Sequence, residues 1–284
     1  MNRANTLIKL VKYGLNCVQA LNVAVGRTFG VIDYPVPPNS IMRKTSATKV
    51  RNFYESGMTT SSPIMTAALS NGIDLRRKDV RILDFGCGGG RQLVHFTKRF
   101  PDPSYFACDI DDSSIAFVRK AFPQVEAHVS SFDPPLKYES GFFDMIYSVS
   151  ILSHLSKEDE SRWLPEMARI IRPGGLFIPT IMGRVGGRAA AKHMGYGEQE
   201  LFAVLDREGI VYREDDDLKE SVSKQETLKS ASACVGVTGT YGTTIISREY
   251  VRSHWNNDQF ELIGFAEGII DYLQDMVVLR RREK

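Results

Sequence analysis

The sequence predicts an α/β fold in which helices cover both faces of a mainly parallel, doubly wound sheet. Between residues 80 and 182, short apolar runs alternate with segments of helical periodicity, the pattern of crossover units on such a sheet. The first run leads into the glycine-rich turn "DFGCGGGR", and the second leads into the acidic turn "CDID". Doubly wound sheets bind ligands at the carboxyl ends of their strands, so both turns lie where a ligand site is expected.

Each expected element follows from a local pattern. Apolar runs bounded by turn residues predict strands at 80–85, 104–110, 125–130, 142–150, 175–182, 260–268 and 274–282. Apolar residues at helical spacing predict helices at 48–71, with a break at Gly57, and at 91–100, 113–122 and 157–171. For the last of these helices, Ser156 is the expected N-cap and "RPGG" at 172–175 the expected end. Pro165 is expected to distort that helix or to delay its start.

Shifts in composition divide the chain. Residues 1–47 are expected to form an N-terminal helix and a linker, and residues 48–284 form the main domain, with a glycine-rich insertion at 183–244. The first 32 residues carry four basic side chains, no acidic one, and apolar residues at helical spacing. This pattern fits a helix packed on the main domain or on a partner subunit, and it also fits a helix lying on an anionic membrane surface. A cleaved signal fits less well because the apolar centre is weak.

The overall composition argues against several functional classes. The 284-residue chain is 43% apolar and 25% charged with a formal net charge of +2, so it lacks the basic excess that would indicate a nucleic-acid partner. Its longest uncharged N-terminal run has 14 residues, fewer than the ~20 that cross a membrane. The four cysteines form no C-x-x-C pair, and no His, Cys or Asp cluster has metal-ligand spacing. Neither a disulfide framework nor a metal ion is therefore expected. A cytoplasmic location is the expected one.

The glycine-rich turn discriminates among three nucleotide-binding templates. The P-loop and the dinucleotide fingerprint both require glycine at the position of Arg91, and both fail there. The template D-x-G-x-G-x-G fits in full, at Asp84, Gly86, Gly88 and Gly90. A carboxylate at this strand end would repel a pyrophosphate but suits the ammonium group of S-adenosylmethionine, which also carries a sulfonium cation. Asp109, at the end of the next strand, suits ribose hydroxyls, a feature that NAD enzymes share.

On these motifs, the chain resembles the class I S-adenosylmethionine-dependent methyltransferases. The resemblance covers about residues 50–182 and 245–284, through "ILDFGCGGGR", "FACDID", "FDMIYSVSILSHL", "ARIIRPGGLF" and the closing pair of strands. It implies a Rossmann-like sheet of seven strands whose last strand is antiparallel, with S-adenosylmethionine as the cofactor.

The resemblance also implies which residues contact the cofactor. They are Asp84 near the methionine amino group, Gly86, Cys87, Gly88 and Gly90 in the loop, Asp109 at the ribose, Ile110 beside the adenine, Ser131 and Phe132 at the adenine edge, and Ser148 at the methionine part. Ordinary strand-end packing is the alternative for Ser131, Phe132 and Ser148. The segment "SSFDPP" lacks the acid that many relatives place first, which weakens the assignment of the adenine edge.

The insertion at 183–244 is expected to cap the acceptor pocket. His154, just past the fourth strand, is a candidate base or acceptor contact, and its alternative role is to orient the loop. Tyr241, within the insertion, is the second catalytic candidate, and its alternative role is packing. Arg188 and His193 are further candidates that equally fit exposure to solvent.

The acceptor is indicated only by a finer resemblance, to bacterial methyltransferases encoded with polysaccharide and glycan biosynthesis enzymes. This resemblance implies O-methylation of a sugar or glycan precursor and places Tyr54 and Gly57 at the methionine end of the cofactor. A lipid-like or quinone-like acceptor at a membrane surface is the alternative, and a non-catalytic partner subunit with this fold is another. A short-chain dehydrogenase is not favoured, because no Tyr-x-x-x-Lys pair follows the fourth strand.

Overall fold

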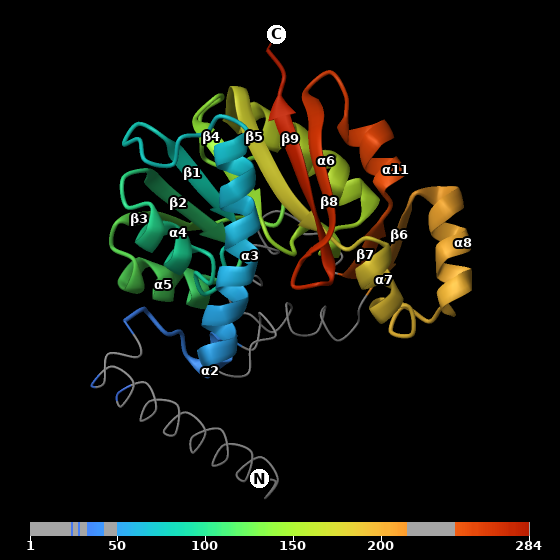
Figure 1. The fold of residues 1–284 in the computed structure, drawn as a ribbon, viewed down its shortest axis with the longest axis horizontal. Helices are drawn as coiled ribbons and strands as arrows, with labels where there is room; N and C mark the ends of the chain where they lie inside the picture. The colour runs from blue at the N-terminus through green and yellow to red at the C-terminus, as the bar shows by residue number, and fades with distance from the viewer. Residues whose placement is uncertain (1–23, 25–27, 29–32, 43–49, 215–241, 284) are drawn as a thin grey trace, which may run out of the picture.

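The computed structural model describes residues 24, 28, 33–42, 50–214 and 242–283. Its centre is a seven-stranded sheet with strand order β3-β2-β1-β4-β5-β9-β8 (Figure 1). The strands are β1 (Arg81–Phe85), β2 (Ser104–Asp109), β3 (Val125–Val129), β4 (Phe143–Ser148), β5 (Ile171–Ile181), β8 (Phe260–Ile270) and β9 (Gln274–Arg281). Strands β1 to β5 pair in parallel, and β9 runs antiparallel to both of its neighbours. The predicted doubly wound sheet with an antiparallel last strand is therefore confirmed.

Helices cover both faces of the sheet because its central strands are apolar on both sides. On β1, Ile82 packs in a cluster with α3, α4 and α5, whereas Leu83 packs with α6 on the opposite face. The first group comprises α3 (Val50–Ser70), α4 (Leu93–Arg99) and α5 (Asp112–Ala121). The second comprises α6 (Lys157–Ile170), α11 (Arg248–Tyr250) and η3 (Val251–Trp255). Because helices cover both faces of the sheet, a ligand is expected at the ends of its strands (Figure 1).

Two local predictions are wrong because contacts with distant residues override them. Helix α3 runs through Gly57 without a break. A Cβ atom at Gly57 would lie 2.5 Å from the Arg91 carbonyl oxygen, so this glycine permits close packing of the helix on the glycine-rich turn. Helix α6 ends at Ile170, close to its expected end, but strand β5 begins at Ile171 rather than at residue 175, because Ile171 already pairs with Phe143 of β4.

The start of α6 agrees with the sequence. The Ser156 hydroxyl accepts a hydrogen bond from the Asp159 backbone N–H at 3.1 Å, so the predicted N-cap is confirmed. Pro165 lies inside α6, yet the helix begins at Lys157 and continues to Ile170. Buried side chains on both sides of the proline, among them Trp163 and Met167, anchor the helix to the sheet and outweigh the lost hydrogen bond.

The insertion forms a small α/β unit beside the sheet (Figure 1). It contains α7 (Arg184–Ala190), α8 (Glu198–Glu208), β6 (Ile210–Glu214) and β7 (Gly242–Ile246), and its two strands pair antiparallel. Its own apolar cluster comprises Ala191, Met194, Leu201, Leu205, Val211 and Ile245. The Ile246 N–H donates to the Met182 carbonyl at 2.9 Å, which fixes β7 to the end of β5.

The structure describes only part of the predicted N-terminal helix and linker. A short helix, α2 (Asn39–Met42), lies within the predicted linker. The apolar positions that predicted the N-terminal helix lie outside the described residues. No helix in the described part of the chain has the length and apolar character needed to span a membrane.

Candidate functional site

The three glycines of the D-x-G-x-G-x-G template determine the backbone conformation of the glycine-rich turn. Gly86, Gly88 and Gly90 all adopt left-handed conformations, with φ of 81°, 49° and 74°. The backbone N–H groups of Gly86 and Cys87 both donate to the Cys108 carbonyl, at 2.9 and 3.0 Å. The turn is thereby fastened to the end of β2. The Cys87 thiol is buried in the core, and burial raises its pKa well above the ordinary value, so only the backbone of Cys87 belongs to the turn surface.

The second predicted acid is positioned by the same turn. One carboxylate oxygen of Asp109 accepts the Gly88 N–H at 2.7 Å, and the other accepts the Asp111 N–H at 2.8 Å. Asp111 in turn caps α5 by accepting the Ser114 N–H at 3.1 Å. Asp109 is therefore held at the carboxyl end of β2 as a fixed hydrogen-bond acceptor beside the glycines.

A cleft opens next to Asp109 and extends over the end of β1. It encloses about 520 Å³ of empty space, which includes open solvent at its mouth. The cleft is lined by Phe85, Gly86, Asp109, Ile110, Ser130, Ser131, Phe132, Ile151, Leu155 and Trp163. Five of these residues were predicted from the sequence: Gly86, Asp109, Ile110, Ser131 and Phe132. The cleft therefore brings the predicted ribose acid together with the predicted adenine contacts.

The apolar wall of the cleft was missed by sequence reasoning. Ile151 lies so close over the turn that a Cβ atom at Gly86 would be 2.2 Å from its Cδ1. The ring of Trp163, from α6, packs against Phe85 with 4.8 Å between ring centroids. In the sequence, Trp163 lies at helical spacing with Met167 and Ile170, a pattern that indicates the core and does not distinguish a core residue from one in a cleft wall. The one available signal for Ile151 was its place directly after the fourth strand.

The acid that precedes the glycines is deeply buried. Asp84 is 1% exposed, and its Oδ2 has no hydrogen-bond partner among the described residues. The Ser148 hydroxyl, fully buried at the end of the neighbouring β4, likewise has no partner there. Burial raises the pKa of Asp84 to about 8, although the neighbouring Tyr147 hydroxyl and the Arg91 guanidinium lower it. A buried carboxyl with an unused oxygen fits a cationic hydrogen-bond donor, and the ammonium group of S-adenosylmethionine is one.

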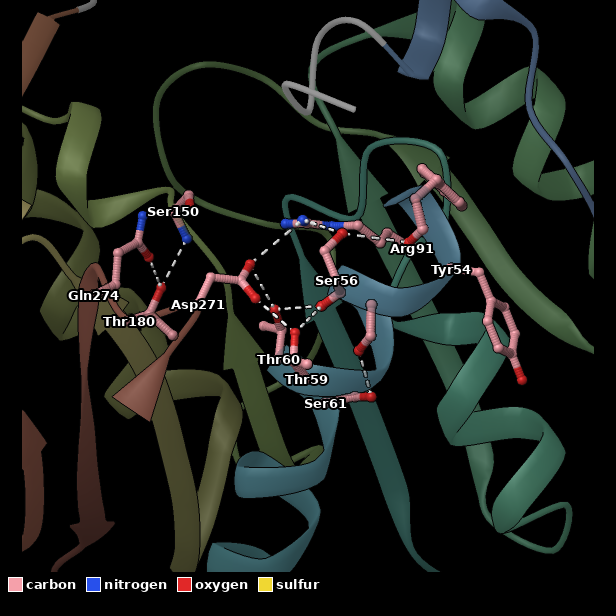
Figure 2. Close-up of polar contacts among 12 residues, drawn as sticks. Tyr54, Ser56, Thr59, Thr60, Ser61, Arg91, Ser150, Thr180, Asp271 and Gln274 are labelled. Atoms are coloured by element: carbon pink, nitrogen blue, oxygen red, sulfur yellow. Dashed lines mark hydrogen bonds and ion pairs between the residues drawn. The ribbon is translucent and has the colours of Figure 1, made fainter. Parts of the chain in front are cut away.

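A polar network lies between α3, the glycine-rich turn and the β8–β9 hairpin (Figure 2). The Arg91 guanidinium donates to the Ser56 hydroxyl at 3.1 Å, and its Nη1 lies 4.0 Å from the Asp271 carboxylate. The Thr59 hydroxyl donates to Asp271 at 2.6 Å. Tyr54 points away from this network, and its ring stacks on Tyr34 with 4.1 Å between centroids. Of the two residues predicted near the methionine end, Gly57 therefore contacts Arg91, whereas Tyr54 packs elsewhere.

A second network fixes the segment that follows β4. The Ser150 N–H donates to the Thr180 hydroxyl at 2.9 Å, and that hydroxyl donates to the side-chain carbonyl oxygen of Gln274 at 2.6 Å. The side-chain amide of Gln274 donates to the Ser150 hydroxyl at 2.7 Å (Figure 2). This closed ring holds Ser150 at a φ of 63°, a conformation that serine rarely adopts. It thereby sets the path of the chain that carries Ile151 and His154.

The predicted catalytic histidine follows that strained residue. The Nδ1 atom of His154 is 2.8 Å from the Gly242 carbonyl oxygen. Because a carbonyl only accepts, Nδ1 carries the proton, and Nε2 is the basic nitrogen of the neutral ring. The Thr244 hydroxyl also donates to the Leu155 carbonyl at 2.6 Å, so β7 is fixed to the same segment.

None of the predicted catalytic and acceptor candidates that the structure describes lines the cleft, and His154 lies in the sequence between the lining residues Ile151 and Leu155. Tyr241 lies outside the described residues. Arg188 forms an exposed ion pair with Glu198 at 2.6 Å, and His193 is exposed. Neither Arg188 nor His193 lines the cleft.

Comparison with known proteins identifies the central part of the chain. Residues 82–175 match a family model described as "Methyltransferase domain". A trans-aconitate 2-methyltransferase of Deinococcus radiodurans is 32% identical over 105 residues, which cover 37% of this chain and 39% of that relative. A tRNA N(3)-cytidine methyltransferase of Danio rerio is 26% identical over 113 residues, covering 37% of this chain and 32% of the relative. The chain thus spans well under half the length of these curated relatives, and their acceptors differ.

A solved structure supports the fold over a longer stretch. A S-adenosylmethionine-dependent methyltransferase from Methanosarcina mazei superimposes with a TM-score of 0.51 at 16% identity. The superposition covers 73% of this chain and 95% of that chain. It therefore reaches beyond the matched family segment, although it carries information about the fold alone.

Proposed function

We propose, on the premise that residues 82–175 form a S-adenosylmethionine-dependent methyltransferase domain, that the whole protein transfers the methyl group of S-adenosylmethionine to a small polar acceptor. One observation carries the proposal. The buried, partly unpartnered Asp84 and the fixed Asp109 lie at the ends of adjacent strands, joined by a turn whose three template glycines are all left-handed. A cationic amino acid and a ribose, linked as in this cofactor, match that pair of acids.

The residues that would hold the cofactor follow from the cleft. Asp109 would accept hydrogen bonds from the ribose, and Ile110, Ser131 and Phe132 would surround the adenine. Asp84 would accept from the ammonium group, with Ser148 beside it. When bound, S-adenosylmethionine supplies a methyl group activated by its positively charged sulfur. The protein's part is to hold this group and the acceptor in line, to exclude water and to take a proton where the acceptor is a hydroxyl.

His154 is the base we propose. Its Nδ1–H is held by the Gly242 carbonyl, so Nε2 is the nitrogen that would accept a proton from an acceptor hydroxyl. The insertion would then serve as the predicted acceptor cap, because β7 reaches His154 through this contact. Substituting His154 by Gln keeps a polar side chain and removes the base. Turnover is expected to fall by about 100-fold with an unchanged affinity for S-adenosylhomocysteine.

A sugar or glycan precursor is the acceptor class we propose first. The exposed Thr59 and the half-buried Ser150 and Gln274 carry hydroxyl and amide groups that suit the hydroxyl groups of such an acceptor. A lipid-like or quinone-like acceptor is the second candidate. It is favoured by three apolar side chains exposed at the tip of the β8–β9 hairpin: Ile269, Tyr272 and Leu273.

Calorimetric titration of the purified protein tests the cofactor. S-adenosylmethionine and S-adenosylhomocysteine are expected to bind with micromolar affinity and NADH not to bind. Asp109→Ala is expected to abolish binding, whereas Asp102→Ala, which removes an exposed acid at the opposite end of β2, is expected to leave it unchanged. A folded protein that binds neither methyl-group ligand would overturn the proposal. Mass-spectrometric screening of sugars, glycan intermediates and quinones for a gain of one methyl group then identifies the acceptor.

A further inference from the structure

Helix α6 buries three acidic side chains, and among the described residues one of them, Glu160, is bonded only by uncharged groups. Asp159 forms an ion pair with Arg162. Glu166 forms an ion pair with Arg169 at 2.7 Å. Glu160 is 2% exposed, and its two donors in the described part of the chain are a hydroxyl and an indole N–H. A buried carboxylate without a cation is costly, so Glu160 is the acid of α6 for which burial favours the uncharged form.

The hydrogen bonds of Glu160 have the asymmetry of a carboxylic acid. The indole N–H of Trp255 donates to Oε1 at 2.7 Å, and the Tyr250 hydroxyl approaches the same oxygen at 3.4 Å. Oε2 is buried and has no partner among the described residues. An unpaired neutral hydroxyl costs less than an unpaired charged oxygen, and a carbonyl oxygen can accept two hydrogen bonds. The arrangement therefore fits Oε1 as the carbonyl oxygen and Oε2 as the oxygen that carries the proton.

The titratable groups around this contact lie on three elements. Burial raises the pKa of Glu160 to about 7, although its two hydrogen bonds and the charge of Lys157 on α6 lower it. On α11, burial chiefly raises the pKa of Tyr250, and the charges of Glu160 and Glu158 raise it further. On η3, the ring of His254 stacks on Tyr250 with 4.0 Å between centroids. Tyr250 thus keeps its proton as a donor, and Glu160 is the buried group that can change charge near neutral pH.

The two donors belong to a segment that anchors the insertion. Helices α11 and η3 follow β7 directly, through Ser247. The Ser247 N–H donates to the Gly209 carbonyl at 2.8 Å, and a Cβ atom at Gly209 would lie 3.0 Å from the Tyr250 Cβ. Strand β7 in turn reaches His154 through the Gly242 carbonyl at 2.8 Å. The contact of Tyr250 and Trp255 with α6 therefore ties the base of the insertion to the main domain.

We propose that Glu160 is a proton-dependent latch, which holds α11 and η3 against α6 while it is protonated and releases them when it ionises. In the released form the side chain meets water and titrates as an ordinary glutamate, with a pKa of 4.5. Because the docked form has the higher pKa, docking is fully favoured below pH 4.5 and weakens as the pH rises through about 7. Each pH unit in this interval shifts the equilibrium about tenfold toward release. The latch does not depend on the proposed function.

Infrared difference spectroscopy and fluorine NMR test the proton and the contact. The full-length wild type is compared between pH 5.5 and 8.5 with Glu160→Gln and with Glu158→Gln, the matched control at an exposed acid one position away. The carboxylic-acid carbonyl band at pH 6, to which Asp84 also contributes, should lose one component in Glu160→Gln and none in Glu158→Gln. After labelling with 5-fluorotryptophan, the resonance of Trp255 should titrate with a midpoint near pH 7 in the wild type and stay constant in Glu160→Gln.

Hydrogen exchange measures the release itself. The amides of residues 250–255 are expected to lose about 30-fold in protection between pH 5.5 and 7, after correction for the intrinsic pH dependence of exchange, because 1.5 pH units act at about tenfold each. Glu160→Gln should keep a constant protection over this interval. Glu158→Gln and His254→Gln should both behave as the wild type does.

Several outcomes would overturn the latch. They are an acid band that is unchanged in Glu160→Gln, a protection that still falls with pH in that variant, and a pH response that disappears in His254→Gln. If Glu160→Gln does not fold, Tyr250→Phe takes its place. This change removes a hydroxyl that lowers the pKa of Glu160, so the midpoint of the Trp255 resonance should move to higher pH, and an unmoved midpoint contradicts the proposal. None of these measurements uses the cofactor, so their failure leaves the proposed function untouched.

Discussion

Asp84 is expected to destabilise the ligand-free protein near neutral pH, and Asp84→Asn tests this directly. Its pKa is about 8 in the folded protein against 3.8 for an unperturbed aspartate, because it is buried. The folded state therefore binds more protons than the unfolded chain between these two values. Stability from this group is fully present below pH 3.8 and is lost as the pH rises through 8.

The size of the effect follows from the two pKa values. Each pH unit between them lowers the free energy of unfolding by about 1.4 kcal/mol. At pH 7, about three units above the unfolded value, the loss attributable to Asp84 is on the order of 4 kcal/mol, a large part of the ~5–15 kcal/mol that stabilises a typical domain. Asparagine has nearly the same shape and does not ionise, so Asp84→Asn removes the dependence.

Denaturant unfolding of both proteins at half-unit steps from pH 5.5 to 9 measures the difference. The variant is expected to be the more stable protein, and the gap should widen with pH and level off above 8. Saturating S-adenosylhomocysteine should narrow or reverse the gap, because its ammonium group pairs with the ionised Asp84. Asp102→Asn, at an exposed acid, is the control and should show no such widening. A gap that stays constant over the whole pH range would refute the reasoning.

Three further predictions concern the surroundings of the site. Gln274→Met breaks the ring that holds Ser150, so kcat should fall about tenfold while the affinity for S-adenosylhomocysteine measured by calorimetry stays unchanged. Gly57→Ala places a methyl group 2.5 Å from the Arg91 carbonyl and should lower the free energy of unfolding by about 1–3 kcal/mol in urea titrations, whereas Gly197→Ala, where no atom lies within 4 Å, should have little effect. Burial raises the pKa of Glu160 to about 7 from 4.5, so stability is lost as the pH rises through this interval, and Glu160→Gln should flatten that part of the unfolding profile.

The parts of the fold that could be predicted are those whose causes are local. A run such as "RILDF" is apolar because β1 is buried on both faces, so its position is readable without knowing its neighbours. The two wrong predictions depend on residues that are distant in the sequence. Gly57 permits α3 to pack closely on the backbone of Arg91, and β5 starts before residue 175 because Ile171 pairs with Phe143. Neither partner is indicated by the local pattern.

The same distinction divides the site. Its cofactor half is built from consecutive strand ends, and parallel topology alone brings Asp84 and Asp109 to one edge of the sheet. Its other half joins residues that no spacing relates: Asp271 bonds Thr59 from 212 positions away, and Gln274 bonds Ser150 from 124. These pairings depend on where the β8–β9 hairpin meets α3 and β4, which only the assembled fold determines. The motifs at the strand ends therefore indicate methyl-transfer chemistry from the sequence alone, whereas the pairings of the β8–β9 hairpin required the structure.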